Sequence, residues 1–170
     1  MCGGLTVSVS LGFVFGLISG RKFNTLESVE AKTRMWRRRY ASAFFSALSM
    51  ALLANKGIGG LLPAPLSALA VFVASAAMAS SVSFQFYQSP GLISSDFGKN
   101  KAVCLSYLDC LGYLLAAPVW KLVSGIVSHP SIGTHGWSVA WSMIAGMIGV
   151  GGMLMLKVMP PILQKQTAKK

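Results

Sequence analysis

Long stretches without charged residues alternate with short basic segments along the chain. A helix needs about 20 predominantly apolar residues, at about 1.5 Å each, to cross roughly 30 Å of hydrocarbon. The pattern therefore predicts an all-α, polytopic transmembrane helix bundle of about five spans that forms one membrane domain. The expected spans cover residues 5–20, 40–55, 64–88, 102–124 and 137–159.

The first two expected spans are short for a full crossing. Each becomes long enough if it begins or ends in the interfacial zone. For the second span, Trp36, Tyr40 and the aliphatic stems of residues 37–39 are the expected interfacial anchors.

Prolines mark the expected boundaries of the later spans. Pro63 and Pro65 stand at the start of the third span, where a missing backbone N–H costs little. Residues 89–91, Ser-Pro-Gly, are expected to end this span, and the proline pair at 160–161 is expected to close the fifth.

Composition excludes most soluble functions. The 170 residues are 54% hydrophobic and 11% charged, whereas an ordinary soluble domain is roughly 25% charged. The sequence contains no nucleophile–base–acid set, no metal-ligand spacing and no glycine-rich phosphate loop, so we expect no enzyme, no metal and no dedicated cofactor. Nor is a soluble small-molecule substrate expected for this chain alone.

Twelve of the fifteen Lys and Arg residues, against four acids, lie in three places, and Lys157 adjoins the third; Lys56 and Lys121 are expected on the opposite side. The three places are a basic loop at residues 21–39, the segment around Lys99 and Lys101, and a basic tail at residues 160–170. With five spans all three lie on one side, which predicts an outer N-terminus and an inner C-terminus on a cytoplasmic, stromal or matrix-type face.

Lipid headgroups are the expected anions for the basic loop, because spans adjoin both of its ends; nucleic acid is not expected. The residues assigned to headgroup contact and orientation are Arg21, Lys22, Arg34, Arg37, Arg38 and Arg39.

Small residues recur at helical spacing and predict close helix packing. Gly12, Gly16 and Gly20 form a continuous ridge in the first span, and Ala145 with Gly149 extends the pattern to the last. Such grooves could also hold an acyl chain or a pigment between helices, although no position is assigned to one.

Asp109 is the one acid inside an expected span, and ionisable groups at membrane depth are costly and usually functional. Lys121 lies about 18 Å further along the helix axis, so the two cannot pair directly. Two interpretations stay open: a protonated or hydrogen-bonded structural group, or a group that takes part in transport.

Three cysteines and two histidines have no spacing typical of a metal site. We interpret Cys2, Cys104 and Cys110 as small packing residues, and His129 with His135 as ordinary loop residues.

The order of motifs from Phe86 onward resembles helices ten to twelve of a major facilitator superfamily transporter, and the whole chain resembles helices eight to twelve of its C-terminal half. The similarity is greatest to the organic-phosphate antiporter subgroup. The matching motifs are Pro90-Gly91, Asp96-Phe97-Gly98-Lys99, Gly112-Tyr113-Leu114 and Gly136-Trp137. The resemblance implies a transporter-like half-bundle.

In that subgroup the substrate-binding arginines lie on the first helix of each half. All five arginines here fall between residues 21 and 39, so no expected span carries a cation at mid-membrane depth. Two functions therefore stay open.

The first function is an accessory or scaffold subunit, derived from a transporter half and packed by its small-residue faces against other subunits. A photosystem or respiratory assembly in a thylakoid or inner mitochondrial membrane is a natural host. The second is a fragment or half of a genuine antiporter.

Overall fold

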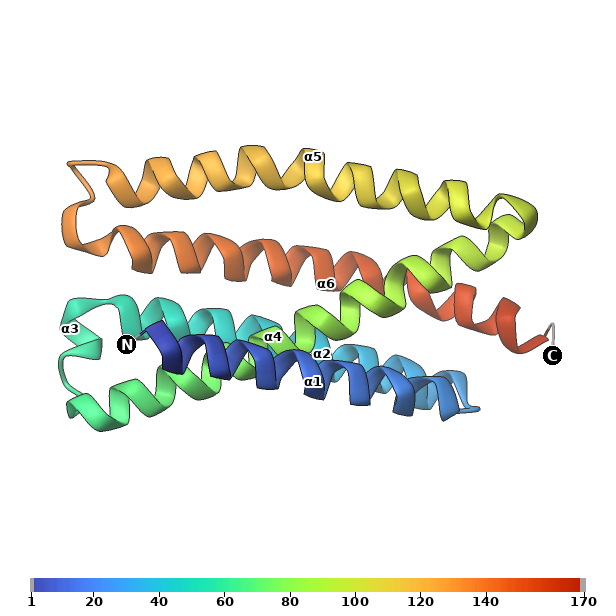
Figure 1. Ribbon diagram of the computed structural model, residues 1–170, viewed down its shortest axis with the longest axis horizontal. Helices are drawn as coiled ribbons and strands as arrows, with labels where there is room; N and C mark the ends of the chain where they lie inside the picture. The colour runs from blue at the N-terminus through green and yellow to red at the C-terminus, as the bar shows by residue number, and fades with distance from the viewer. Residues whose placement is uncertain (1, 169–170) are drawn as a thin grey trace.

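A computed structural model describes residues 2–168, with the side chains of residues 3–94 and 97–165 (Figure 1). This part of the chain is helical and contains no strand, which confirms the expected all-α class. Its elements are α1 (Cys2–Thr25), α2 (Val29–Ala54), α3 (Lys56–Gly59), α4 (Ala64–Ser94), η1 (Ser95–Asn100), α5 (Lys101–Ser128), η2 (Gly133–His135) and α6 (Gly136–Ala168).

Four segments in the described residues are helical, long enough and apolar enough to cross a membrane. They are Gly3–Thr25, Ala64–Ser94, Phe97–Ser128 and Gly133–Lys165. The fifth long helix, α2, is apolar only in its C-terminal half, and it lies lengthwise in the same bundle (Figure 1). The arrangement agrees with about five spans.

The expectation of a loop over residues 21–39 is wrong. Helix α1 continues to Thr25 and α2 begins at Val29, so only residues 26–28 separate them. Arg, Lys, Glu, Ala and Met all favour helix, and Ser28 caps the new helix by accepting a hydrogen bond from the Ala31 N–H at 3.3 Å.

The expected ends at the later prolines are also wrong. Helix α4 continues through Pro90 to Ser94, and α6 continues through Pro160 and Pro161 to Ala168. Met159 and Leu163 flank the proline pair and are both fully buried, so tertiary packing offsets the lost backbone hydrogen bonds. The expected tail is therefore largely helix, and residues 169–170 lie outside the described part.

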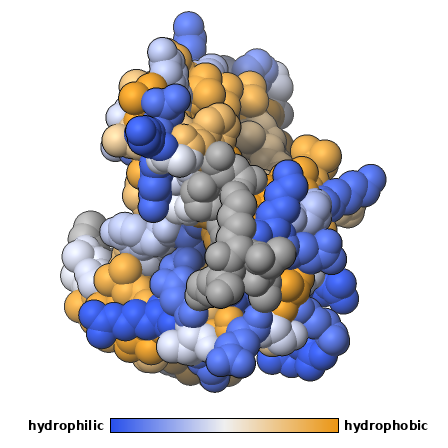
Figure 2. Space-filling model, turned by 90° about the vertical axis from the view of Figure 1, so that its right-hand side faces the viewer, coloured by the Kyte–Doolittle hydropathy of each residue, from blue (hydrophilic) through white to orange (hydrophobic). Residues whose placement is uncertain are grey.

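Successive long helices alternate in direction along the bundle (Figure 1). The α1–α2 turn, η1 and the end of α6 lie at one end, on the right of Figure 1. Figure 2 looks onto this end and shows hydrophilic residues gathered across it, with hydrophobic ones between them. We call it the basic end.

Helices α1 and α4 run parallel in close contact. A Cβ atom at Gly12 would lie 2.4 Å from the Ala76 carbonyl oxygen, and one at Gly16 would lie 2.7 Å from that of Ser80. The Ser8 hydroxyl donates to the Phe72 carbonyl across the same interface, at 2.6 Å. Small residues and hydroxyls at interfaces are typical of helices that associate in a membrane.

Helix α6 packs on α2 in the same manner. Gly149 lies against the ring of Phe44, Gly152 lies against Tyr40, and Ala145 is buried. The Ser138 hydroxyl donates to the Ala51 carbonyl at 2.8 Å.

One cluster of fully buried side chains joins four helices near the basic end: Phe23, Trp36, Phe84, Met159 and Leu163. The three aromatic rings meet edge to face, with centroids 5.3 to 6.0 Å apart. Trp36 was expected at the membrane interface, but it lies inside this cluster because its position on α2 faces α1 and α4. Helix α5 contributes nothing to the cluster and lies at the side of the four-helix bundle (Figure 1).

We predict that Gly16→Ala lowers the free energy of unfolding by about 1–3 kcal/mol, because the added methyl group meets backbone and Ser83 on α4. The control is Gly146→Ala, where the new Cβ meets nothing within 4 Å. It should change stability by less than about 1 kcal/mol. Unfolding in mixed detergent micelles measures both, and equal stabilities would contradict the packing described.

Candidate functional site

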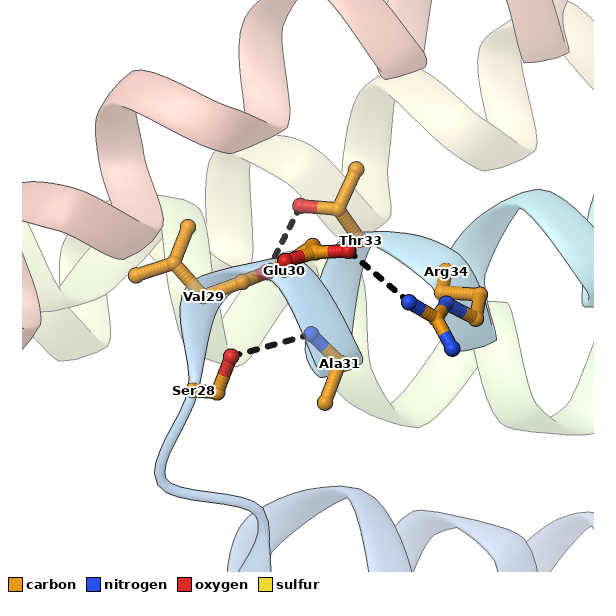
Figure 3. Close-up of polar contacts among 6 residues, drawn as sticks. All are labelled: Ser28, Val29, Glu30, Ala31, Thr33 and Arg34. Atoms are coloured by element: carbon orange, nitrogen blue, oxygen red, sulfur yellow. Dashed lines mark hydrogen bonds and ion pairs between the residues drawn. The ribbon is translucent and has the colours of Figure 1, made fainter.

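Local polar contacts order the first turns of α2 (Figure 3). Glu30 stands in the first turn, where its charge is favourable near the helix N-terminus, and it pairs with Arg34 one turn later at 2.8 Å. The Thr33 hydroxyl donates to the Val29 carbonyl at 2.8 Å. These local contacts support the start of the helix from which the arginines project.

Arg39 links three helices. Its Nη1 donates to the Ser80 hydroxyl of α4 at 2.8 Å, and its Nη2 donates to the Ser19 hydroxyl of α1. Its guanidinium carbon lies 5.7 Å from the centroid of the Phe84 ring. Ser19 is about 9 Å inward from the end of α1, so the charge lies below the bundle end and is stabilised by hydroxyls and a ring face.

A cavity of about 590 Å³ opens beside this arginine, between the end of α1 and the start of α2. Four cationic side chains line it, and none of its described lining residues is acidic. The cations are Lys22, Arg34, Arg38 and Arg39, and the other lining residues include Ser19, Ser42, Leu26 and Met35. The cavity is therefore an electropositive recess with one apolar side.

The structure separates the six residues that were assigned together to headgroup contact. Four of them line the cavity, whereas Arg21 and Arg37 are exposed outside it. The sequence could show that the cations cluster, but only the helical register of α2 shows which of them converge.

The predicted packing residues lie at contacts within the chain. Gly12, Gly16 and Gly20 face α4, Gly149 faces α2, and Ala145, one turn before Gly149 on the same helix face, is buried. Helices of the same chain occupy these glycine positions, and contact of small-residue faces with other subunits stays a prediction.

Asp109 lies on α5 and is exposed. It lines a groove of about 360 Å³ with Phe86 and Pro90 of α4 and Gly112 and Tyr113 of α5. Among the described side chains, no hydrogen bond or ion pair reaches its carboxylate. Pro90 has no N–H with which to bond the Phe86 carbonyl one turn earlier.

The remaining candidates contribute little. Cys110 is exposed and is not the packed residue that was expected, whereas Cys104 is half-buried, and the side chain of Cys2 lies outside the described part. His129 caps α5, and its Nδ1 accepts from the Ser131 N–H at 3.3 Å. Within the described residues, no three His, Cys, Asp or Glu side chains could share a metal ion.

Sequence reasoning missed two features. One is the contact of Arg39 with Ser19 and Ser80. The sequence indicates it only by the presence of a serine in each of two apolar spans. The other is the exposure of α5, on which Tyr107, Tyr113 and Trp120 are each more than two-thirds exposed.

Comparison of the chain with protein-family models, curated protein sequences and solved structures gave no match.

We predict that Arg39→Lys lowers the free energy of unfolding by about 1–2 kcal/mol. A single ammonium group cannot reach both serine hydroxyls in the geometry of the guanidinium fork. Arg37→Lys is the matched control, since Arg37 is exposed two residues away on the same helix. Detergent unfolding of the two variants should separate them, and an Arg39→Lys protein as stable as its control would refute the three-helix contact.

Proposed function

We propose that this chain is a non-catalytic transmembrane subunit that supports a larger membrane protein complex, with α5 against a neighbouring subunit. The proposal rests on the exposure of α5. Of its described residues only Val123 is buried, although the helix is long and apolar enough to cross a membrane.

The carboxylate of Asp109 argues against lipid as the neighbour of α5. It lies about 12 Å from the first residue of α5, inside the membrane-spanning segment. Acyl chains offer no hydrogen-bond donor, whereas ionisable groups at this depth usually face protein or a wet cavity. A neighbouring helix with a donor or a cation would stabilise this carboxylate.

Tyrosine hydroxyls on the same helix support the same conclusion. Tyr107 is 68% exposed and Tyr113 is 78% exposed. A hydroxyl in hydrocarbon costs several kcal/mol unless it finds a partner, so these groups favour a protein contact over a lipid one.

The proposed orientation places the basic end on the cytoplasmic, stromal or matrix-type face, with the N-terminus on the other side. It rests on the collection of the α1–α2 turn, η1 and the end of α6 at one end of the bundle. An organellar photosystem or respiratory complex is the host that we propose.

A piece of an organic-phosphate antiporter is the alternative. It rests on the motifs from Phe86 onward and on the prolines inside α4, α5 and α6, since broken backbone hydrogen bonds are tolerated where neighbouring helices or a cavity satisfy them. In that case the helix against α5 would belong to the rest of a transporter.

A photoreactive amino acid at Tyr113 tests the subunit proposal in the native membrane. We expect a covalent product with another polypeptide, whereas the same probe at Phe15 on α1, which is 59% exposed, should label mainly lipid. Mass spectrometry of the products identifies both. Only lipid adducts from position 113 would contradict the proposal.

Substitutions at Asp109 and at its neighbour Cys110 separate the role of the carboxylate from that of the surface around it. Asp109→Leu should reduce the yield of the Tyr113 product several-fold, whereas Cys110→Ala should leave it unchanged. Asp109→Asn distinguishes the two forms of contact: it should preserve the product if the group is hydrogen-bonded and abolish it if the group is paired as an ion.

A further inference from the structure

We infer that the electropositive cavity at the basic end is a binding site for the phosphate group of an anionic phospholipid. This inference is independent of the subunit proposal, because it concerns a different end of the molecule and different helices.

Charge is the first argument. Lys22, Arg34, Arg38 and Arg39 surround one cavity of about 590 Å³. Arg34 is paired with Glu30, and Arg39 is bound to two serines, whereas no described side chain pairs with Lys22 or Arg38. Four neighbouring cations repel one another unless an anion lies among them.

Donor geometry is the second argument. Arg39 is held by Ser19 and Ser80, which fixes the position of its guanidinium group at the inner side of the cavity. A guanidinium group has five N–H donors, so two contacts to serine leave others for a ligand. Arginine forks match phosphate oxygens, and a fixed fork loses less conformational entropy on binding.

The position of the cavity identifies the source of the phosphate as a lipid. The cavity lies where α1 ends, at the end of a segment long enough to cross the membrane. Leu26 and Met35 give it an apolar side. One turn further into the span, Phe15 on α1 is exposed on the same helix face as Ser19 and offers a surface for an acyl chain.

Binding can be measured on the full chain in nanodiscs of phosphatidylcholine that contain a small fraction of phosphatidylglycerol. Native mass spectrometry should show phosphatidylglycerol retained in preference to phosphatidylcholine. Arg38→Gln and Lys22→Gln should each weaken retention about fivefold, since a basic residue near a charged membrane surface contributes on the order of that factor.

Arg37→Gln is the matched control, because Arg37 carries the same charge on the same helix and does not line the cavity. Its retention of phosphatidylglycerol should change by less than twofold. Equal losses from Arg37→Gln and Arg38→Gln would overturn the site in favour of diffuse surface charge. Displacement of the lipid by millimolar inorganic phosphate would also overturn it, because the ligand would then be a soluble anion. Circular dichroism verifies that each variant keeps its helices.

Discussion

A charged side chain at membrane depth must be covered by groups that stabilise its charge, and this constraint organises the whole molecule. Arg39 meets it within the chain, through hydroxyls of Ser19 and Ser80 and the face of Phe84. Asp109 does not meet it among the described side chains. The contacts of Arg39 join α1, α2 and α4 of the same chain. Asp109 has no such contact and is exposed on α5.

Packing explains why the two charges differ. Glycine and serine let α4 approach α1 closely, and this contact places Ser19 and Ser80 on either side of Arg39. Buried aromatic and aliphatic side chains hold α1, α2, α4 and α6 together between Arg39 and the basic end. Helix α5 has no such close contact: a Cβ at Gly112 or Gly125 would meet nothing within 4 Å, and of its described residues only Val123 is buried.

The helical class, the membrane-spanning segments and the start of the α4 helix near Pro63 and Pro65 could be predicted from the sequence, because hydrophobic length and charge spacing determine them locally. The helix over residues 29–39 was missed although the helix propensity of its residues favours it, because its arginines suggested a surface loop. The burial of Trp36, which also favours the helix, could not be predicted from the sequence. Pro90 and the proline pair at 160–161 misled for a related reason: tertiary contacts of their neighbours outweigh the local cost. The set of cations that line the cavity depends on the helical register of α2, and the positions of the basic residues in the sequence do not reveal that register.

We propose that this bundle packs against another protein and does not move solutes alone. The most direct measurement is the mass and composition of the particle that carries the chain after extraction from its native membrane in mild detergent, followed by a phosphate-ester exchange assay in liposomes. We expect a large multi-subunit particle without exchange activity. A particle that contains this chain alone, or with one complementary helical chain, and that exchanges phosphate esters would contradict the proposal.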